Sequence, residues 1–210
     1  MFDFAAAPVA VREDLKMAYA TLWTHFARAG AIYDGHERRA ILDRARSCNE
    51  RTPTSTDFVS EEIAHLAATL YCDPVAVDEA LVRSAADAHG DAAVVEVIAL
   101  VSMLSAVDGA HRALGVELEP LPEPLAGSPS GRTRSGLRRR RTHIPMPRGA
   151  IRSALDLVPS EALAFDESSG PQYMTGREME FLDFSRSPGL NRAQMELVSS
   201  RTSLLNKCFY

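Results

Sequence analysis

The stretch that decides the fold is Ala92–Leu114, AAVVEVIALVSMLSAVDGAHRAL, in a chain of 210 residues. Its apolar side chains fall on nearly every face of a helix, and Gly115 follows as a stop signal. A helix that is apolar almost all round is normally the buried centre of a bundle. We therefore expect a helical bundle built around this segment.

Helical spacing of apolar residues and capping signals predict further helices on both sides of this segment. Asn191, with Gln194 three residues later, forms a capping-box pattern at the start of a closing helix. No stretch shows sustained alternation with a period of two, so the predicted fold class is all-α. The other predicted helices cover residues 9–29, 35–48, 58–71, 74–89, 151–157 and 177–184, with one or two turns within 160–173.

The composition is that of an ordinary globular protein, 46% hydrophobic with a net charge of −5. This charge implies no general attraction to nucleic acid or to an anionic membrane. There is no run of eighteen apolar residues and no basic N-terminal region, so neither a transmembrane span nor a secretory signal is expected. Three widely spaced cysteines, Cys48, Cys72 and Cys208, do not suggest a disulfide framework, and a cytoplasmic location is expected.

The segment 116–149 differs from its surroundings, because it contains six prolines and, between Arg132 and Arg148, seven arginines without an acidic residue. Such a composition indicates a linker or a long surface crossover. The arginines could form a patch for nucleic acid or an acidic partner. No aromatic residue lies among them to stack on bases, so a solvated charge run is the favoured interpretation.

The closing helix places a carboxylate twelve positions before a cysteine. This pattern resembles the thiol-peroxidase family of alkylhydroperoxidase D and carboxymuconolactone decarboxylase, whose members carry a Glu, a helix with Ser-x-x-Asn near its end, and then Cys-x-x-Cys-x-x-x-His. The matching residues are Glu196, Ser203, Asn206 and Cys208, with Phe209 and Tyr210 as the spacers.

The resemblance implies an all-α helical bundle of the alkylhydroperoxidase D-like type and an antioxidant thiol peroxidase or disulfide reductase. Glu196 would be the proton-relay carboxylate and Cys208 the proximal, resolving thiol. The implied partners are a peroxide substrate, a dithiol reductant and further copies of the chain; no cofactor is implied. The family's second cysteine and its histidine have no positions in this sequence, so little peroxidase turnover is expected of the chain as written.

An internal echo supports the resemblance. Glu37 precedes Cys48 by eleven residues, and the segment 111–122, HRALGVELEPLP, is similar to the end of the family's helical repeat. The expected organisation is a degenerate first repeat over 1–121, a Pro/Arg-rich linker over 122–149, and the opening part of a second repeat over 150–210 that ends in the incomplete cysteine motif.

Two other functions stay open. The chain could be a non-catalytic helical module for oligomerisation or binding, or a decarboxylase-type enzyme that uses His and Glu without a cysteine pair. Asp108 and His111 lie three residues apart on one helix, so they are expected to pair. The remaining histidines show no metal-ligand spacing, and no metal site is expected.

Overall fold

The structure is a computed structural model that describes residues 2–49, 58–140, 142–147, 153–186 and 189–207. These residues form helices, turns and two isolated β-bridges, with no strand among them, and the predicted all-α class is confirmed. The α-helices are α1 (Glu13–Ala27), α2 (Gly35–Arg46), α3 (Glu61–Cys72), α4 (Glu79–His89), α5 (Asp91–Leu114), α6 (Pro159–Gln172) and α7 (Arg192–Leu205).

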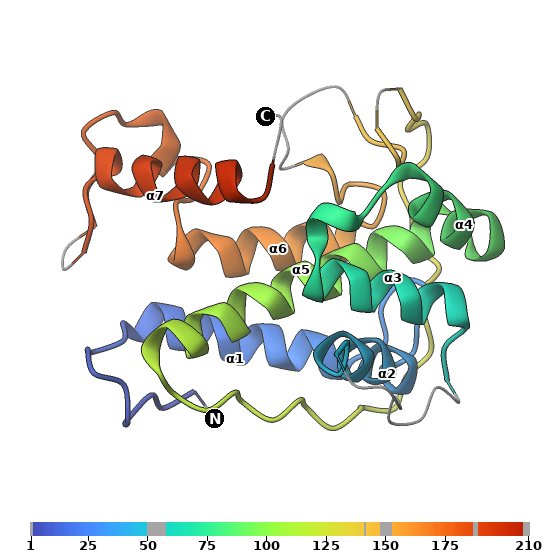
Figure 1. Cartoon of the computed structure of the whole chain (residues 1–210), viewed down its shortest axis with the longest axis horizontal. Helices are drawn as coiled ribbons and strands as arrows, with labels where there is room; N and C mark the ends of the chain where they lie inside the picture. The colour runs from blue at the N-terminus through green and yellow to red at the C-terminus, as the bar shows by residue number, and fades with distance from the viewer. Residues whose placement is uncertain (1, 50–57, 141, 148–152, 187–188, 208–210) are drawn as a thin grey trace. The chain divides into compact units, whose positions relative to one another are not determined.

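Helix α5 is the core helix that its sequence predicts. It contacts α2, α3 and α4 in the bundle (Figure 1). Val94, Leu100 and Leu104, on three of its turns, are completely buried. By length and composition α5 is the one helix in the described part of the chain that could cross a membrane. Two thirds of its apolar window, 67%, is buried inside the protein, as in the core helix of a globular bundle.

Side-chain and glycine caps fix where the helices begin and end. Asp34 accepts hydrogen bonds from the first turn of α2, and Glu37 completes a capping box there. Asn191 and Gln194 form the predicted capping box on α7. Gly115 ends α5 in the left-handed conformation, with φ of 67°, which a residue without a Cβ adopts at no steric cost.

The chain divides into two compact units, unit 1 (Met1–Ser168) and unit 2 (Ser169–Tyr210). The described part of the Pro-rich segment belongs to unit 1. It is extended and lies alongside α1 and α2. Pro120 accepts a hydrogen bond from the Trp23 indole (2.8 Å), and the backbone of Leu125 donates to Ala27 (2.7 Å).

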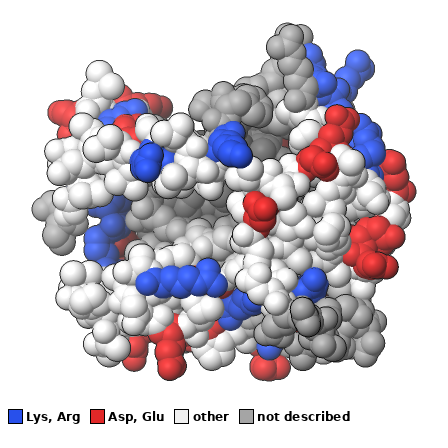
Figure 2. Space-filling view, in the orientation of Figure 1, with Lys and Arg blue, Asp and Glu red and all other residues white. Residues whose placement is uncertain are grey.

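The arginines of this segment are partly engaged by acidic residues. Arg134 pairs with Asp156 at 2.5 Å, and Arg139 pairs with Asp91. On the face shown in Figure 2, basic and acidic residues are interspersed. Both observations fit a solvated charge run.

The prediction of a helix over 177–184 is wrong for most of that range. Only the 3₁₀ turn η3 (Glu178–Glu180) forms there, and turns follow it. In this segment Arg192 donates to the carbonyls of Met179 (2.5 Å) and Phe181 (3.0 Å), so side-chain hydrogen bonds hold the backbone where a helical ladder was expected.

Candidate functional site

Glu196 lies in the second turn of α7, within unit 2. Its carboxylate accepts a hydrogen bond from the Tyr173 hydroxyl at 2.9 Å, and its other oxygen lies 3.4 Å from Arg192 Nε, one turn earlier. Partial burial and the bond to Glu196 raise the pKa of Tyr173, so the phenol stays a proton donor to the carboxylate. The Glu196 side chain is 45% exposed, and solvent can reach the carboxylate that these two residues orient.

Cys208 lies outside the described residues. Helix α7 ends at Leu205, and Asn206, a residue of the predicted motif, is its C-terminal cap. The structure therefore defines the helix that leads to Cys208 and the environment of Glu196.

The other two cysteines form a disulfide bond between Cys48, just after α2, and Cys72, at the end of α3, with their Cα atoms 6.2 Å apart. The expectation that the cysteines do not pair is wrong here. Helices α2 and α3 pack closely and bring together two residues that are 24 positions apart in sequence. In the internal echo, Cys48 is thus disulfide-bonded and Glu37 serves as a cap of its own helix.

The predicted pair of Asp108 and His111 does not form. Asp108 is fully buried and binds the guanidinium of Arg46 through both oxygens, at 2.6 and 2.9 Å, and it accepts from the Tyr71 hydroxyl at 2.5 Å. His111 Nδ1 donates instead to the Val107 carbonyl, one turn earlier in α5 (2.8 Å). A bidentate arginine satisfies a buried carboxylate more fully than a histidine on the same helix could.

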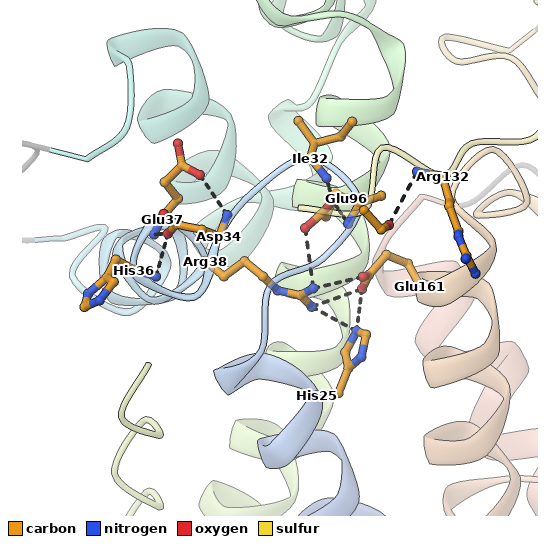
Figure 3. Close-up of polar contacts among 11 residues, drawn as sticks. His25, Ile32, Asp34, His36, Glu37, Arg38, Glu96, Arg132 and Glu161 are labelled. Carbon is orange, nitrogen blue, oxygen red and sulfur yellow. Dashed lines mark hydrogen bonds and ion pairs between the residues drawn. The ribbon is translucent and has the colours of Figure 1, made fainter. Parts of the chain in front are cut away.

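A second polar cluster lies inside unit 1, and sequence reasoning missed it. It joins Arg38 of α2, Glu96 of α5, Glu161 of α6 and His25 of α1, which we call the buried quartet (Figure 3). The side chains of the arginine and both glutamates are completely buried, and that of His25 is 22% exposed. Four helices thus supply one ionisable group each to this cluster.

Arg38 is the centre of the buried quartet. Its guanidinium lies 3.2 Å from Glu161 Oε1, 3.4 Å from Glu96 Oε1 and 2.9 Å from His25 Nε2. The other oxygen of Glu96 accepts from the backbone N–H groups of Ala31 (3.1 Å) and Ile32 (2.8 Å). The network therefore ties the loop between α1 and α2 to the core helix.

The pKa values of the two carboxylates are shifted in opposite directions. Burial, reinforced by the nearby charge of Glu161 and only partly opposed by Arg38, raises the pKa of Glu96 to about 7. Burial would also raise the pKa of Glu161, but the hydrogen bond with His25 and the charge of Arg38 outweigh it and hold that pKa below its usual range. Glu161 is consequently ionised at neutral pH, while Glu96 exchanges a proton there.

The contact with Glu161 indicates which ring nitrogen of His25 carries a hydrogen. The ring Nε2 lies 2.8 Å from Glu161 Oε2, so it carries a hydrogen and donates it to the carboxylate. Arg38 cannot then donate to the same nitrogen, and its contact with His25 is a close approach. Nδ1 of His25 makes no hydrogen bond to any described residue, which leaves that nitrogen to act on a ligand.

His25 also borders a cavity of about 420 Å³ that residues of α1 and α6 line within unit 1. The histidine is thus the one member of the buried quartet with access to this space. A pocket of this size with a fixed histidine at its wall has the elements of a small-molecule site.

One signal in the sequence points to the buried quartet. Glu96 is the only charged residue between Ala92 and Val107, on a helix that is otherwise apolar. Arg38 likewise falls on the inward face of α2, at helical spacing from Ile41 and Leu42. A charge at a core position requires partners, which was the available clue. No such signal in the sequence marks Glu161 of α6 as their partner.

The described residues contain no group of three or more histidine, cysteine or acidic side chains arranged to hold a metal ion. Comparison with protein-family models, curated proteins and solved structures gives no match to this chain.

Proposed function

We propose that the chain is a thiol-dependent redox protein of the alkylhydroperoxidase D-like type with low turnover, in which Cys208 reduces a peroxide and Glu196 moves the proton. The resemblance makes Cys208 a resolving thiol, but we assign it the attack on the peroxide because Cys48 and Cys72 are bound to each other in a disulfide. The observation that carries the proposal is the setting of Glu196. Its carboxylate is oriented by Tyr173 and Arg192, half open to solvent, and on the helix that leads to Cys208. The remaining support is the sequence motif of Glu196, Ser203, Asn206 and Cys208.

The chemistry requires a thiolate and a proton donor for the leaving group. Glu196 accepts the Cys208 proton, the sulfur attacks the peroxide, and the O–O bond breaks. The proton then passes to the departing alkoxide, so that thiol and hydroperoxide become sulfenic acid and alcohol. An external dithiol returns the sulfenic acid to the thiol, releasing water and its own disulfide.

The test is peroxide consumption with a dithiol reductant. Cys208→Ser should abolish the consumption, and Glu196→Gln should lower it by roughly a hundredfold, the lower range of general acid–base contributions. Glu180→Gln, an exposed glutamate in the same unit, is the matched control and should leave the rate unchanged. A rate that survives Cys208→Ser would overturn the proposal.

A second candidate function is self-association, which an exposed apolar stripe on α7 favours. Leu197, Val198, Leu204 and Leu205 are between 59% and 72% exposed, and their spacing places them on one side of the helix. Such a patch fits the matching face of a second copy of the chain.

Sedimentation velocity tests this surface. The wild-type chain should sediment as a dimer or a larger species, and the double variant Leu204→Ser and Leu205→Ser should shift it to a monomer. Leu182→Ser removes an even more exposed leucine (87%) outside α7 and serves as the control. A wild-type monomer at every concentration would contradict the proposal.

A further inference from the structure

The cavity between α1 and α6 has walls of two kinds. Ala18, Leu22, Leu163 and Ala164 form an apolar surface, while His25 and several hydroxyl groups supply polar contacts. Its volume of about 420 Å³ is sufficient for a molecule the size of a substituted aromatic ring. The cavity lies wholly in unit 1, so its role does not depend on the redox function proposed for α7.

The buried quartet, which reaches this cavity through His25, is a costly way to fill the bundle core. Placing Arg38 and two glutamates in a bundle core costs desolvation free energy that an apolar core of the same volume would avoid. Arg38 Nε and Glu96 Oε1 also make no hydrogen bond within the described part of the chain. Buried charged groups with incomplete hydrogen bonding require an explanation, and a functional role is one of them.

His25 connects the cavity to the buried quartet. Glu161 fixes the ring through Nε2, and Arg38 in turn fixes Glu161. A histidine that is held by a buried carboxylate on one nitrogen presents the other as a proton acceptor, which is the arrangement of general-base dyads.

The charges around the cavity select the ligand. Among the described residues that line it there is no lysine or arginine, and Glu167 contributes a negative charge. A carboxylate or phosphate would therefore find no counter-charge apart from a protonated His25. A neutral molecule meets no such penalty.

We propose that this cavity binds a small, uncharged, mainly apolar molecule with one hydroxyl group, of the phenol class, which donates its hydroxyl hydrogen to His25. The ring packs against Leu22 and Leu163, and the His25–Glu161 dyad receives the hydroxyl. Binding of this kind places an acidic O–H beside a fixed base.

The experiment compares phenol with its methyl ether, anisole, by ultraviolet difference absorption at neutral pH, at which the free phenol keeps its proton. The full-length protein should bind the phenol saturably and at least tenfold more tightly than the ether, which lacks the hydrogen. No saturable binding of the phenol, or equal affinity for both probes, would overturn the proposal.

Two variants locate the site. Leu163→Trp fills the cavity from a position that is 60% exposed, so the fold should be retained and the phenol affinity should fall at least tenfold. Leu182→Trp places the same side chain at an exposed position outside the cavity and should bind like the wild type. Unchanged affinity in Leu163→Trp would show that the phenol binds elsewhere.

His25→Phe tests the role of the nitrogen, because it keeps a ring while removing the acceptor. This variant should bind the phenol and the ether with similar affinity. A tenfold preference for the phenol that persists in His25→Phe would overturn the assignment of His25. If His25→Phe does not fold, the outcome with Leu163→Trp decides whether the cavity is the site.

Discussion

At the scale of single residues, Gly30 is the position where the buried quartet tolerates least change. A Cβ at this glycine would overlap Glu96 Oε1 and Arg38 Nη1, which pair with each other at 3.4 Å. Both side chains are also held elsewhere, Glu96 through its second oxygen and Arg38 through Glu161. We expect Gly30→Ala to lower the free energy of unfolding by about 1 to 3 kcal/mol, the range for overpacking a core. Gly109→Ala is the control, because a Cβ there meets nothing within 4 Å and a helix interior gains about 0.5–1 kcal/mol from alanine. Chemical denaturation of both variants measures the difference.

The raised pKa of Glu96 makes a second prediction at this scale. Because its folded pKa is about 7 and its unfolded value 4.5, the protonated form favours folding, and this contribution is lost as the pH rises from 4.5 through 7. The loss amounts to about 3 kcal/mol. Between pH 5 and 8 the unfolding free energy of Glu96→Gln should therefore rise relative to the wild type by roughly this amount. The exposed Glu61→Gln should follow the wild type, and parallel curves for wild type and Glu96→Gln would contradict the prediction.

At the scale of elements, the Cys48–Cys72 disulfide links the ends of α2 and α3 across 24 positions. Closing a loop of this length lowers the entropy of the unfolded chain and stabilises the fold by about 3 kcal/mol. Replacing both cysteines with serine should reduce the unfolding free energy by that amount, and added reductant should then have no further effect. Cys208→Ser should keep the full sensitivity to reductant. Equal stability of the oxidised protein and the double serine variant would be inconsistent with a stabilising bond.

The elements also show what sequence can and cannot predict. The core helix, its Gly115 stop and the Asn191 capping box are local signals, and each was predicted correctly. The disulfide and the buried quartet depend on which helices meet. Arg38 and Glu161 are 123 residues apart, and no local pattern records their contact. Glu196 was predicted from its sequence motif, whereas the buried quartet was visible only as two charged residues, Glu96 and Arg38, at core positions of their helices.

At the scale of the whole molecule, the exposed stripe on α7 gives a prediction about solution conditions. If apolar burial drives self-association, sulfate should strengthen it, because this ion is excluded from protein surfaces and favours burial. Light scattering should show a mass that increases with sulfate in the wild type and stays constant in the Leu204→Ser and Leu205→Ser double variant. A mass that falls with added salt would indicate that charge pairs hold the copies together instead.

The buried quartet also has a consequence for biosynthesis. The ribosome makes α1, α2 and α5 well before α6, so Arg38 and Glu96 can meet while Glu161 is still absent. During that interval the core holds an arginine whose chief acidic partner has not yet been made. We therefore expect this region to stay accessible to water until α6 packs over it. Contacts between distant parts of a chain form slowly compared with helices, so we expect the packing of α6 to be the slow step in the folding of unit 1.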